Sequence, residues 1–181
     1  MPGFKDNTMT EDRLHQAADK LEIMDLSSNY MRGLDRLDGE LERSVFWGDA
    51  FCSYGIYEGG PDGFVDYCQN ALATHGSNHH FIGQINIDLD GDEAFGEVYY
   101  QAFHRVKDAA GEDRDLFVSG RYVDRYERRN GVWKIAYRSE LVDWVREEVA
   151  ADSWFVGSQM IVGGRKPDDP LYHRDVMHKR S

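Results

Sequence analysis

The stretch DLFVSGRYVDRYERRNGVWKIAYRSELVDWV, residues 115–145, carries the strongest structural signal in this chain of 181 residues. Two runs rich in β-branched and aromatic residues, about 115–128 and 132–145, meet at the pair Asn130-Gly131. Asn-Gly between two such runs favours a tight hairpin turn, because both turn residues adopt positive φ angles there. The sequence therefore predicts a long antiparallel hairpin.

The residues before this hairpin extend the same pattern. From His79 the odd positions, such as Phe81 and Ile87, are mostly apolar, while His80 falls on the alternate face. Asp90-Gly91-Asp92 is a turn signal. The run after it places Ala94, Val98, Tyr100, Ala102, His104 and Val106 on one face. Long paired strands with tight turns predict an antiparallel sheet.

Helical spacing dominates the first third of the chain. Apolar and small residues recur every three or four positions and predict a helix over about 9–32, which Gly33 ends. A second short helix with Asp38 as its N-cap is expected to close at Trp47, and a third begins at Pro61. The predicted apolar stripe of the first helix consists of Leu14, Ala17, Ala18, Leu21, Met24 and Ser28.

The order of elements predicts the fold class. Helices first and strands afterwards favour an α+β fold, because each part needs the other to bury its apolar face. We expect one domain over residues 1–149, with the helices on one side of a curved sheet. Residues 150–181 lose the regular pattern and contain several Gly and Pro residues. This segment is expected to form an irregular extension that acts as a lid or an inter-subunit arm.

Charge and composition exclude several classes of partner. Thirty-three acidic residues against 21 basic ones give a formal net charge of −12, the wrong sign for nucleic acid or an anionic membrane. Only Cys52 and Cys68 are present, so neither a disulfide framework nor a cysteine zinc site is expected. The polar N-terminus and the lack of a long apolar run predict a cytoplasmic protein without a membrane span.

Several polar residues are candidates for chemistry, although each also has an ordinary structural role. Asp35 fits either a turn carboxylate or a catalyst, and His104 fits either a core histidine or a pocket group. His75, His79 and His80 raise the question of a metal site. Strand alternation places His79 and His80 on opposite faces and no H-E-x-x-H motif is present, so no metal is predicted.

The sequence pattern leaves the roles of two further residues open. Arg138 shares a strand face with Ala136, opposite Trp133, and is either exposed to solvent or paired with an anion in a pocket. Tyr30 lies near the helix stripe, where most tyrosines pack against a core.

The chain resembles the SnoaL-like branch of the nuclear transport factor 2-like superfamily over roughly residues 10–146. The matching segments, in order, are YMRGLDRLDG (30–39), WGDA (47–50), HFIG (80–83), IDLDGDEA (87–94) and GRYVDRYERRNGVWKI (120–135). The resemblance implies a cone of N-terminal helices closed over a strongly curved sheet, with a central pocket. Family members such as scytalone dehydratase, bile-acid 7α-dehydratase and hexachlorocyclohexane dehydrochlorinase carry out eliminations without a metal or an organic cofactor.

The resemblance also implies a set of site residues. Asp35 and His80 match the Asp–His pair that these enzymes share. Arg138 matches a pocket arginine of some members, Tyr30 a tyrosine of the bile-acid enzyme, and His104 lies near a second polar pocket residue. The pocket walls are expected to be formed by Val98, Tyr100, Phe103 and Tyr122.

Elementary chemistry supports this pairing. Removing a proton from carbon needs a base whose pKa lies near the working pH, and imidazole at about 6.5 meets that need. A carboxylate on the other ring nitrogen fixes the tautomer and stabilises the imidazolium, so Asp35 is expected to orient His80. Tyr30, Arg138 and His104 are then the donors for the charge that develops on the substrate.

The sequence therefore predicts a lyase without a cofactor, eliminating water, formaldehyde or a similar group from an aromatic or polycyclic molecule such as a lignin-derived diaryl compound. Two alternatives remain: a non-catalytic small subunit of a ring-hydroxylating dioxygenase, and an isomerase or cyclase acting on a polyketide or steroid. The resemblance also implies self-association as a trimer.

Overall fold

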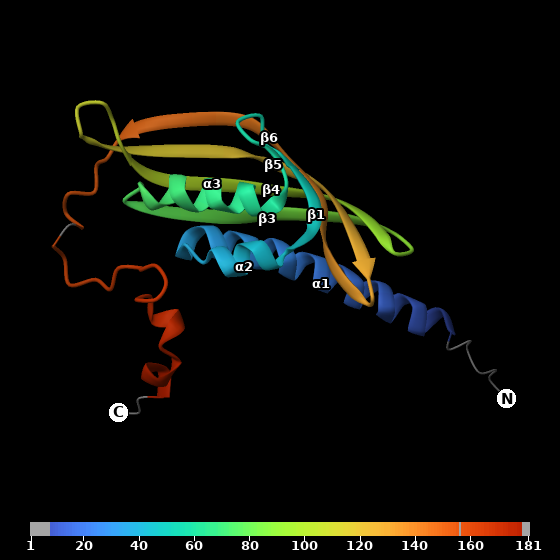
Figure 1. Ribbon diagram of the computed structural model, residues 1–181. Helices are drawn as coiled ribbons and strands as arrows, with labels where there is room; N and C mark the ends of the chain where they lie inside the picture. Colours follow the sequence, from blue (N-terminus) through green and yellow to red (C-terminus); the bar gives the residue numbers. More distant parts are fainter. Residues whose placement is uncertain (1–7, 156, 179–181) are drawn as a thin grey trace.

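A computed structural model describes residues 8–155 and 157–178 and shows an α+β fold (Figure 1). The helices are α1 (Thr8–Arg36), α2 (Gly39–Ser44) and α3 (Pro61–Ala73), followed late in the chain by the short 3₁₀ helices η1 (Pro170–Tyr172) and η2 (Arg174–His178). The strands are β1 (Phe46–Ser53), β2 (Glu58–Gly59), β3 (Ser77–Asp90), β4 (Glu93–Lys107), β5 (Asp113–Arg129) and β6 (Val132–Val149). Within the described ranges no helix has the length and apolar character needed to cross a bilayer.

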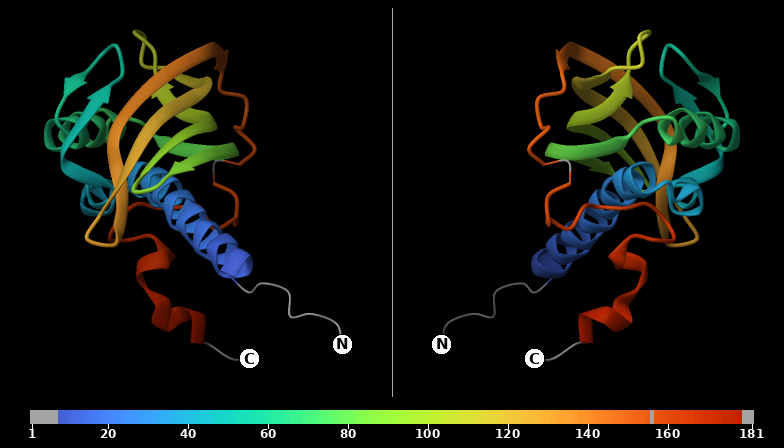
Figure 2. Two further views of the ribbon diagram at one scale, coloured as in Figure 1. Left: turned by 90° about the vertical axis from the view of Figure 1, so that its right-hand side faces the viewer. Right: turned by 90° about the vertical axis from the view of Figure 1, so that its left-hand side faces the viewer.

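The six strands form one open, mixed sheet in the order β2-β1-β6-β5-β4-β3. Strands β3 to β6 make an antiparallel meander, and β1 adds to β6 in parallel. The sheet curves strongly and the three helices pack on it, with α1 crossing beneath the meander (Figure 2). The predicted cone-shaped α+β architecture is confirmed.

Strand β1 is absent from the sequence prediction, which placed Phe46 and Trp47 at the end of a helix. Phe46 instead pairs in register with Ile135 of β6, and its side chain is buried. The Trp47 indole Nε1–H donates to the Glu127 carbonyl oxygen at 2.9 Å. Pairing with a strand some 90 residues later in the chain is a tertiary effect that local spacing does not reveal.

Helix α1 does not end at Gly33 as predicted. Gly33 lies inside the helix where α2 crosses it, and a Cβ at this position would lie 2.8 Å from the Glu42 Cβ. The helix continues to Arg36 and ends at Leu37, which has a φ of 50°. Asp35 therefore sits in the last turn of α1, close to the sheet.

The apolar stripe predicted for α1 is wrong, because all six of its residues are exposed. Leu14 and Leu21 are 64% and 63% exposed, whereas Ile23, only two residues after Leu21, is fully buried. The face of α1 that packs on the sheet consists of Ile23, Ser27, Tyr30, Met31 and Leu34.

A β-bulge in β3 turns His80 inward. The pairing with β4 shifts between Ile82 and Ile85, so one extra residue stands on β3 at this point. A bulge of this kind reverses the alternation of side chains on the two sides of it. Phe81, predicted to share the inner face with Ile87, is therefore 62% exposed, and His80 faces the helices.

A second bulge, in β6, turns the Arg138 side chain inward. Tyr126 pairs with Ile135 while Arg125 pairs with Tyr137, which leaves Ala136 as the extra residue. Arg138 consequently lies on the same buried face as Ile135, and not on the face opposite to it as alternation predicted.

Gly120 marks a third irregularity, between Ser119 and Gly120 of β5, and gives a testable prediction. A Cβ at this position would overlap the Leu141 carbonyl oxygen of β6. Gly120→Ala is expected to lower the free energy of unfolding by about 3 kcal/mol, at the upper end of overpacking effects. Urea denaturation measures this loss.

Gly48→Ala is the matched control, because a Cβ at Gly48 of β1 would meet nothing within 4 Å. Its effect is expected to stay within about 0.5 kcal/mol. Equal stabilities of the two variants would contradict the close approach of β5 and β6 at Gly120.

Candidate active site

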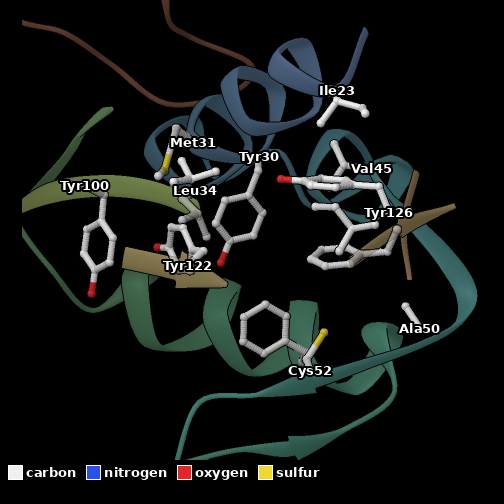
Figure 3. Close-up of a cluster of buried hydrophobic side chains, with 14 of the residues drawn as sticks. Ile23, Tyr30, Met31, Leu34, Val45, Ala50, Cys52, Tyr100, Tyr122 and Tyr126 are labelled. Atoms are coloured by element: carbon white, nitrogen blue, oxygen red, sulfur yellow. The ribbon is translucent and has the colours of Figure 1, made fainter. Parts of the chain in front are cut away.

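A cavity of about 190 Å³ lies between the helices and the inner face of the sheet. Aromatic rings form much of its wall, which also carries two imidazoles, one carboxyl group and one thiol. The lining residues are Tyr30, Leu34, Tyr54, Ile56, Phe64, Tyr67, Cys68, Ala71, Leu72, His80, His104, Tyr122 and Glu140. Figure 3 shows Tyr30 and Tyr122 side by side, with Tyr30 descending from α1 toward the strands.

His80 lines this cavity and forms a well-defined polar pair with Asp35, which lies behind it. The His80 Nδ1 lies 2.7 Å from Asp35 Oδ1, with the two side chains only 6% and 9% exposed. The His80 backbone N–H also donates to Oδ1 and Oδ2 of Asp35, at 3.0 and 3.1 Å. Since the carboxylate accepts at Nδ1, the neutral His80 ring carries its proton there and keeps a lone pair on Nε2.

His104 is the second imidazole at the cavity, 5.2 Å from the His80 ring between centroids. Its Nδ1 lies 2.9 Å from the Asn78 Oδ1, and the Asn78 amide donates to the Leu72 carbonyl at 3.2 Å, which fixes the amide orientation. Burial, with smaller contributions from the neighbouring His80 and His75, lowers the pKa of His104 to about 3. His104 is therefore a neutral ring with Nδ1–H donating to Asn78.

His75 belongs to the same polar network as His104 and Asn78. The His75 Nδ1 lies 2.7 Å from the same Asn78 oxygen. His79 points the other way and lines a groove on the outer face of the sheet. Among the residues described, no group of three or more His, Cys, Asp or Glu side chains is arranged to hold a metal ion.

Two tyrosines supply hydroxyl groups at the cavity. The Tyr30 and Tyr54 hydroxyl oxygens lie 3.0 Å apart. Burial raises the pKa of both phenols well above the ordinary value, and their mutual repulsion adds to the shift of Tyr30. Both stay protonated, and a pair sharing one hydrogen bond keeps one O–H for another acceptor. Tyr54 was not predicted, because it lies in the loop after the unpredicted strand β1.

Arg138 does not line the cavity, which corrects its predicted contact with substrate. It is fully buried behind the wall, where its guanidinium donates to both Asp124 oxygens at 2.8 and 2.7 Å. Its central carbon lies 4.4 Å from the ring centroids of both Tyr30 and Tyr122. Arg138 thus packs against the Tyr30 and Tyr122 rings of the cavity wall through cation–π contacts.

The four predicted wall residues have different positions. Tyr122 lines the cavity, whereas Val98 is fully buried in the core. Tyr100 stacks on Tyr122, with ring centroids 4.7 Å apart, and forms a second layer. Phe103 is a correction: it lies on the outer face of the sheet beside His79, because odd positions of β4 face outward.

Glu140 of β6 is a cavity residue that the sequence prediction missed. Its Oε1 accepts a hydrogen bond of 2.6 Å from the Tyr100 hydroxyl. Burial raises the pKa of the Glu140 carboxyl, while the Tyr100 bond and the charges of His80 and Arg138 act in the opposite direction. Glu140 lies two residues after Arg138 and therefore on the same face of β6. This spacing predicts a position at the cavity only when the bulge at Ala136 is known.

Comparison with known proteins gives consistent results. Residues 15–139 match a family described as the SnoaL-like domain. Hexachlorocyclohexane dehydrochlorinase 1 from Sphingobium indicum is 28% identical over 131 residues, which cover 68% of this chain and 80% of that protein.

Two solved structures are similar in fold. A type 3 hexachlorocyclohexane dehydrochlorinase from Novosphingobium barchaimii is 22% identical, with a TM-score of 0.69 and coverage of 77% of this chain and 96% of that one. A protein described as a candidate scytalone dehydratase from Novosphingobium aromaticivorans is 21% identical, with a TM-score of 0.66 and coverage of 75% and 91%. At these identities the likenesses establish the shared fold.

Proposed function

Because this chain belongs to the SnoaL-like domain family, we propose that it is a lyase that eliminates water, formaldehyde or a similar small group without a cofactor. The observation that carries the proposal is the Asp35–His80 hydrogen bond of 2.7 Å at the wall of a largely aromatic cavity. The similarity to a dehydrochlorinase, an enzyme named for an elimination, supports the same class of reaction.

The proposed reaction begins at His80. Its Nε2 takes a proton from a substrate carbon, and the C–H electron pair forms a double bond as the leaving group departs. Asp35 holds the ring in the required tautomer and stabilises the imidazolium that forms. The free O–H of the Tyr30–Tyr54 pair donates to a substrate oxygen that gains negative charge in the transition state.

The cavity supports an aromatic substrate of modest size. Phe64, Tyr67 and Tyr122 present rings to its interior. Its volume of about 190 Å³ suits a compound of one ring or two fused rings. We choose β-hydroxy-α-tetralone as a bicyclic probe. Its carbonyl makes the neighbouring C–H acidic, the next carbon carries the hydroxyl group, and loss of water gives α-naphthol.

Mass spectrometry of this reaction tests the proposal. Turnover is expected to yield α-naphthol, one water lighter than the substrate, whereas a product of unchanged mass would mean an isomerase. Absence of α-naphthol from the wild-type reaction would contradict a lyase for this class of substrate.

Asp35→Asn is expected to lower kcat for this probe by about 10²–10⁴-fold, because the amide has no charge to stabilise the His80 imidazolium. Asp88→Asn is the matched control, since Asp88 is exposed on β3 and does not line the cavity. Equal rates of the two variants in steady-state assays would show that Asp35 has no part in the reaction.

We further propose that the chain self-associates as a trimer through the outer face of the sheet. This face carries exposed apolar side chains such as Phe81 at 62% and Phe95 at 48%. Several exposed apolar side chains on one face are typical of protein interfaces. Sedimentation equilibrium is expected to give three times the chain mass, and a monomer at micromolar concentration would contradict this.

The division into a domain over residues 1–149 and an extension over 150–181 is likewise a proposal. Described residues of the extension lie against the end of α1 in the same chain: the Lys166 Nζ is 2.9 Å from Asp38 Oδ1, and the Tyr172 hydroxyl is 3.1 Å from Asp38 Oδ2. Arg36 donates to the Gly164 carbonyl at 2.5 Å. These intrachain contacts, next to Asp35, favour a lid over an inter-subunit arm.

A further inference from the structure

One titratable group at the cavity has no part in the mechanism above. Glu140 enters from β6, and its Oε1 is held by the Tyr100 hydroxyl at 2.6 Å. Within residues 8–155 and 157–178, no side chain or backbone group donates to its Oε2. One carboxyl oxygen is therefore fixed in place while the other is left for a molecule in the cavity.

This carboxyl group is the one acid of suitable strength among the described groups at the cavity wall. His104 is a neutral ring whose N–H is committed to Asn78, so that its Nε2 accepts hydrogen bonds and has no proton to give. Tyr30, Tyr54 and the Cys68 thiol have pKa values raised by burial, which makes them weaker acids than usual. Burial likewise favours the protonated form of Glu140, which remains a much stronger acid than a phenol.

We propose that Glu140 is the acid that protonates a departing oxygen, so that the natural substrates of this site are alcohols that lose water, although an activated halide can also react there. This inference rests on the proposed function. A halide ion leaves without a proton, whereas hydroxide is a poor leaving group unless it is protonated as the C–O bond breaks. A buried acid at the same cavity as His80 serves the second case, because only there does the leaving group need a proton.

Two proton transfers accompany the proposed elimination. His80 Nε2 takes the proton from the carbon beside the substrate carbonyl, and the C–H electron pair becomes the new π bond. The C–O bond breaks with its electron pair on oxygen, Glu140 gives its proton to that oxygen, and water leaves. His80 is then protonated and Glu140 ionised, and transfer of one proton from the imidazolium to the carboxylate through water restores both groups.

Glu140→Gln tests this with two probes that share one product. Glutamine keeps the size of the side chain and an oxygen that accepts from Tyr100, but it has no proton to transfer. With β-hydroxy-α-tetralone the variant is expected to lose about 10²–10⁴-fold in kcat. With β-chloro-α-tetralone, which also gives α-naphthol, its rate above the buffer reaction is expected to stay near that of the wild type.

Further variants separate the two proposals. Glu147→Gln, an exposed change on the same strand, is expected to leave both rates unchanged. Glu140→Asp, which keeps an acid, is expected to retain more of the hydroxyl reaction than Glu140→Gln does. Equal losses of Glu140→Gln on both probes would overturn the role of Glu140 as an acid while His80-dependent elimination stands. Turnover of neither probe by the wild type would overturn the proposed function and this inference with it.

Discussion

His80→Ala is expected to lower kcat for β-hydroxy-α-tetralone by about 10²–10⁴-fold, the contribution of a well-placed general base. The fold is expected to survive this change for a specific reason. The backbone N–H of residue 80 still donates to both Asp35 oxygens, at 3.0 and 3.1 Å, so the buried carboxylate loses the imidazole but keeps its backbone donor. Steady-state kinetics together with a thermal unfolding curve separate loss of the base from loss of the structure.

His79→Ala is the matched control for this experiment. The two histidines are adjacent in β3, but His79 faces the outer groove and His80 faces the cavity. The control is expected to retain the wild-type rate. If the two alanine variants had similar kcat values, the assignment of His80 as the base would be wrong.

Asp124→Ala is expected to lower the free energy of unfolding by about 3–5 kcal/mol. Asp124 and Arg138 form an ion pair with no solvent exposure of either side chain, joined by hydrogen bonds of 2.8 and 2.7 Å. Removal of the carboxylate leaves the guanidinium charge buried without a counterion, a far larger penalty than the loss of one hydrogen bond. The shift is measured by urea denaturation.

Asp143→Ala provides the comparison. Asp143 pairs with Arg121 at 3.3 Å on the surface, where the two side chains are 47% and 30% exposed, so its loss is expected to cost less than about 1 kcal/mol. The double variant Asp124→Ala/Arg138→Met is expected to regain much of the stability lost by Asp124→Ala, because the unpaired charge is then gone. A double variant no more stable than Asp124→Ala alone would contradict an electrostatic origin of the loss.

Most of the fold could be predicted because its signals are local. The Asn130-Gly131 turn, the period of two in β3 to β6 and Pro61 at the start of α3 each act over a few residues. Strand β1 could not be predicted in this way, since Phe46 is extended by its pairing with Ile135 and not by its own neighbours.

The resemblance to the SnoaL-like family predicted the residues of the candidate site more fully than the alternation of side chains along the strands did. A strict period of two places His80 and Arg138 on the wrong faces, and one extra residue in each strand reverses both. Ala136 gives no local signal of the bulge in β6, whereas Gly83 lies within the shifted segment of β3 and an isolated glycine in a strand often marks a bulge. The same reversal brings Glu140 to the cavity, which is why alternation alone did not reveal it.

The central claim is that Asp35 holds His80 with its free nitrogen toward the cavity, and NMR spectroscopy of isotope-labelled histidine nitrogens tests it without any substrate. With His80→Ala used for assignment, the neutral His80 ring of the wild type is predicted to carry its proton on Nδ1. In Asp35→Ala the proton is predicted to distribute between the two ring nitrogens. A proton on Nε2 in the wild type, or the same distribution in both proteins, would contradict the account.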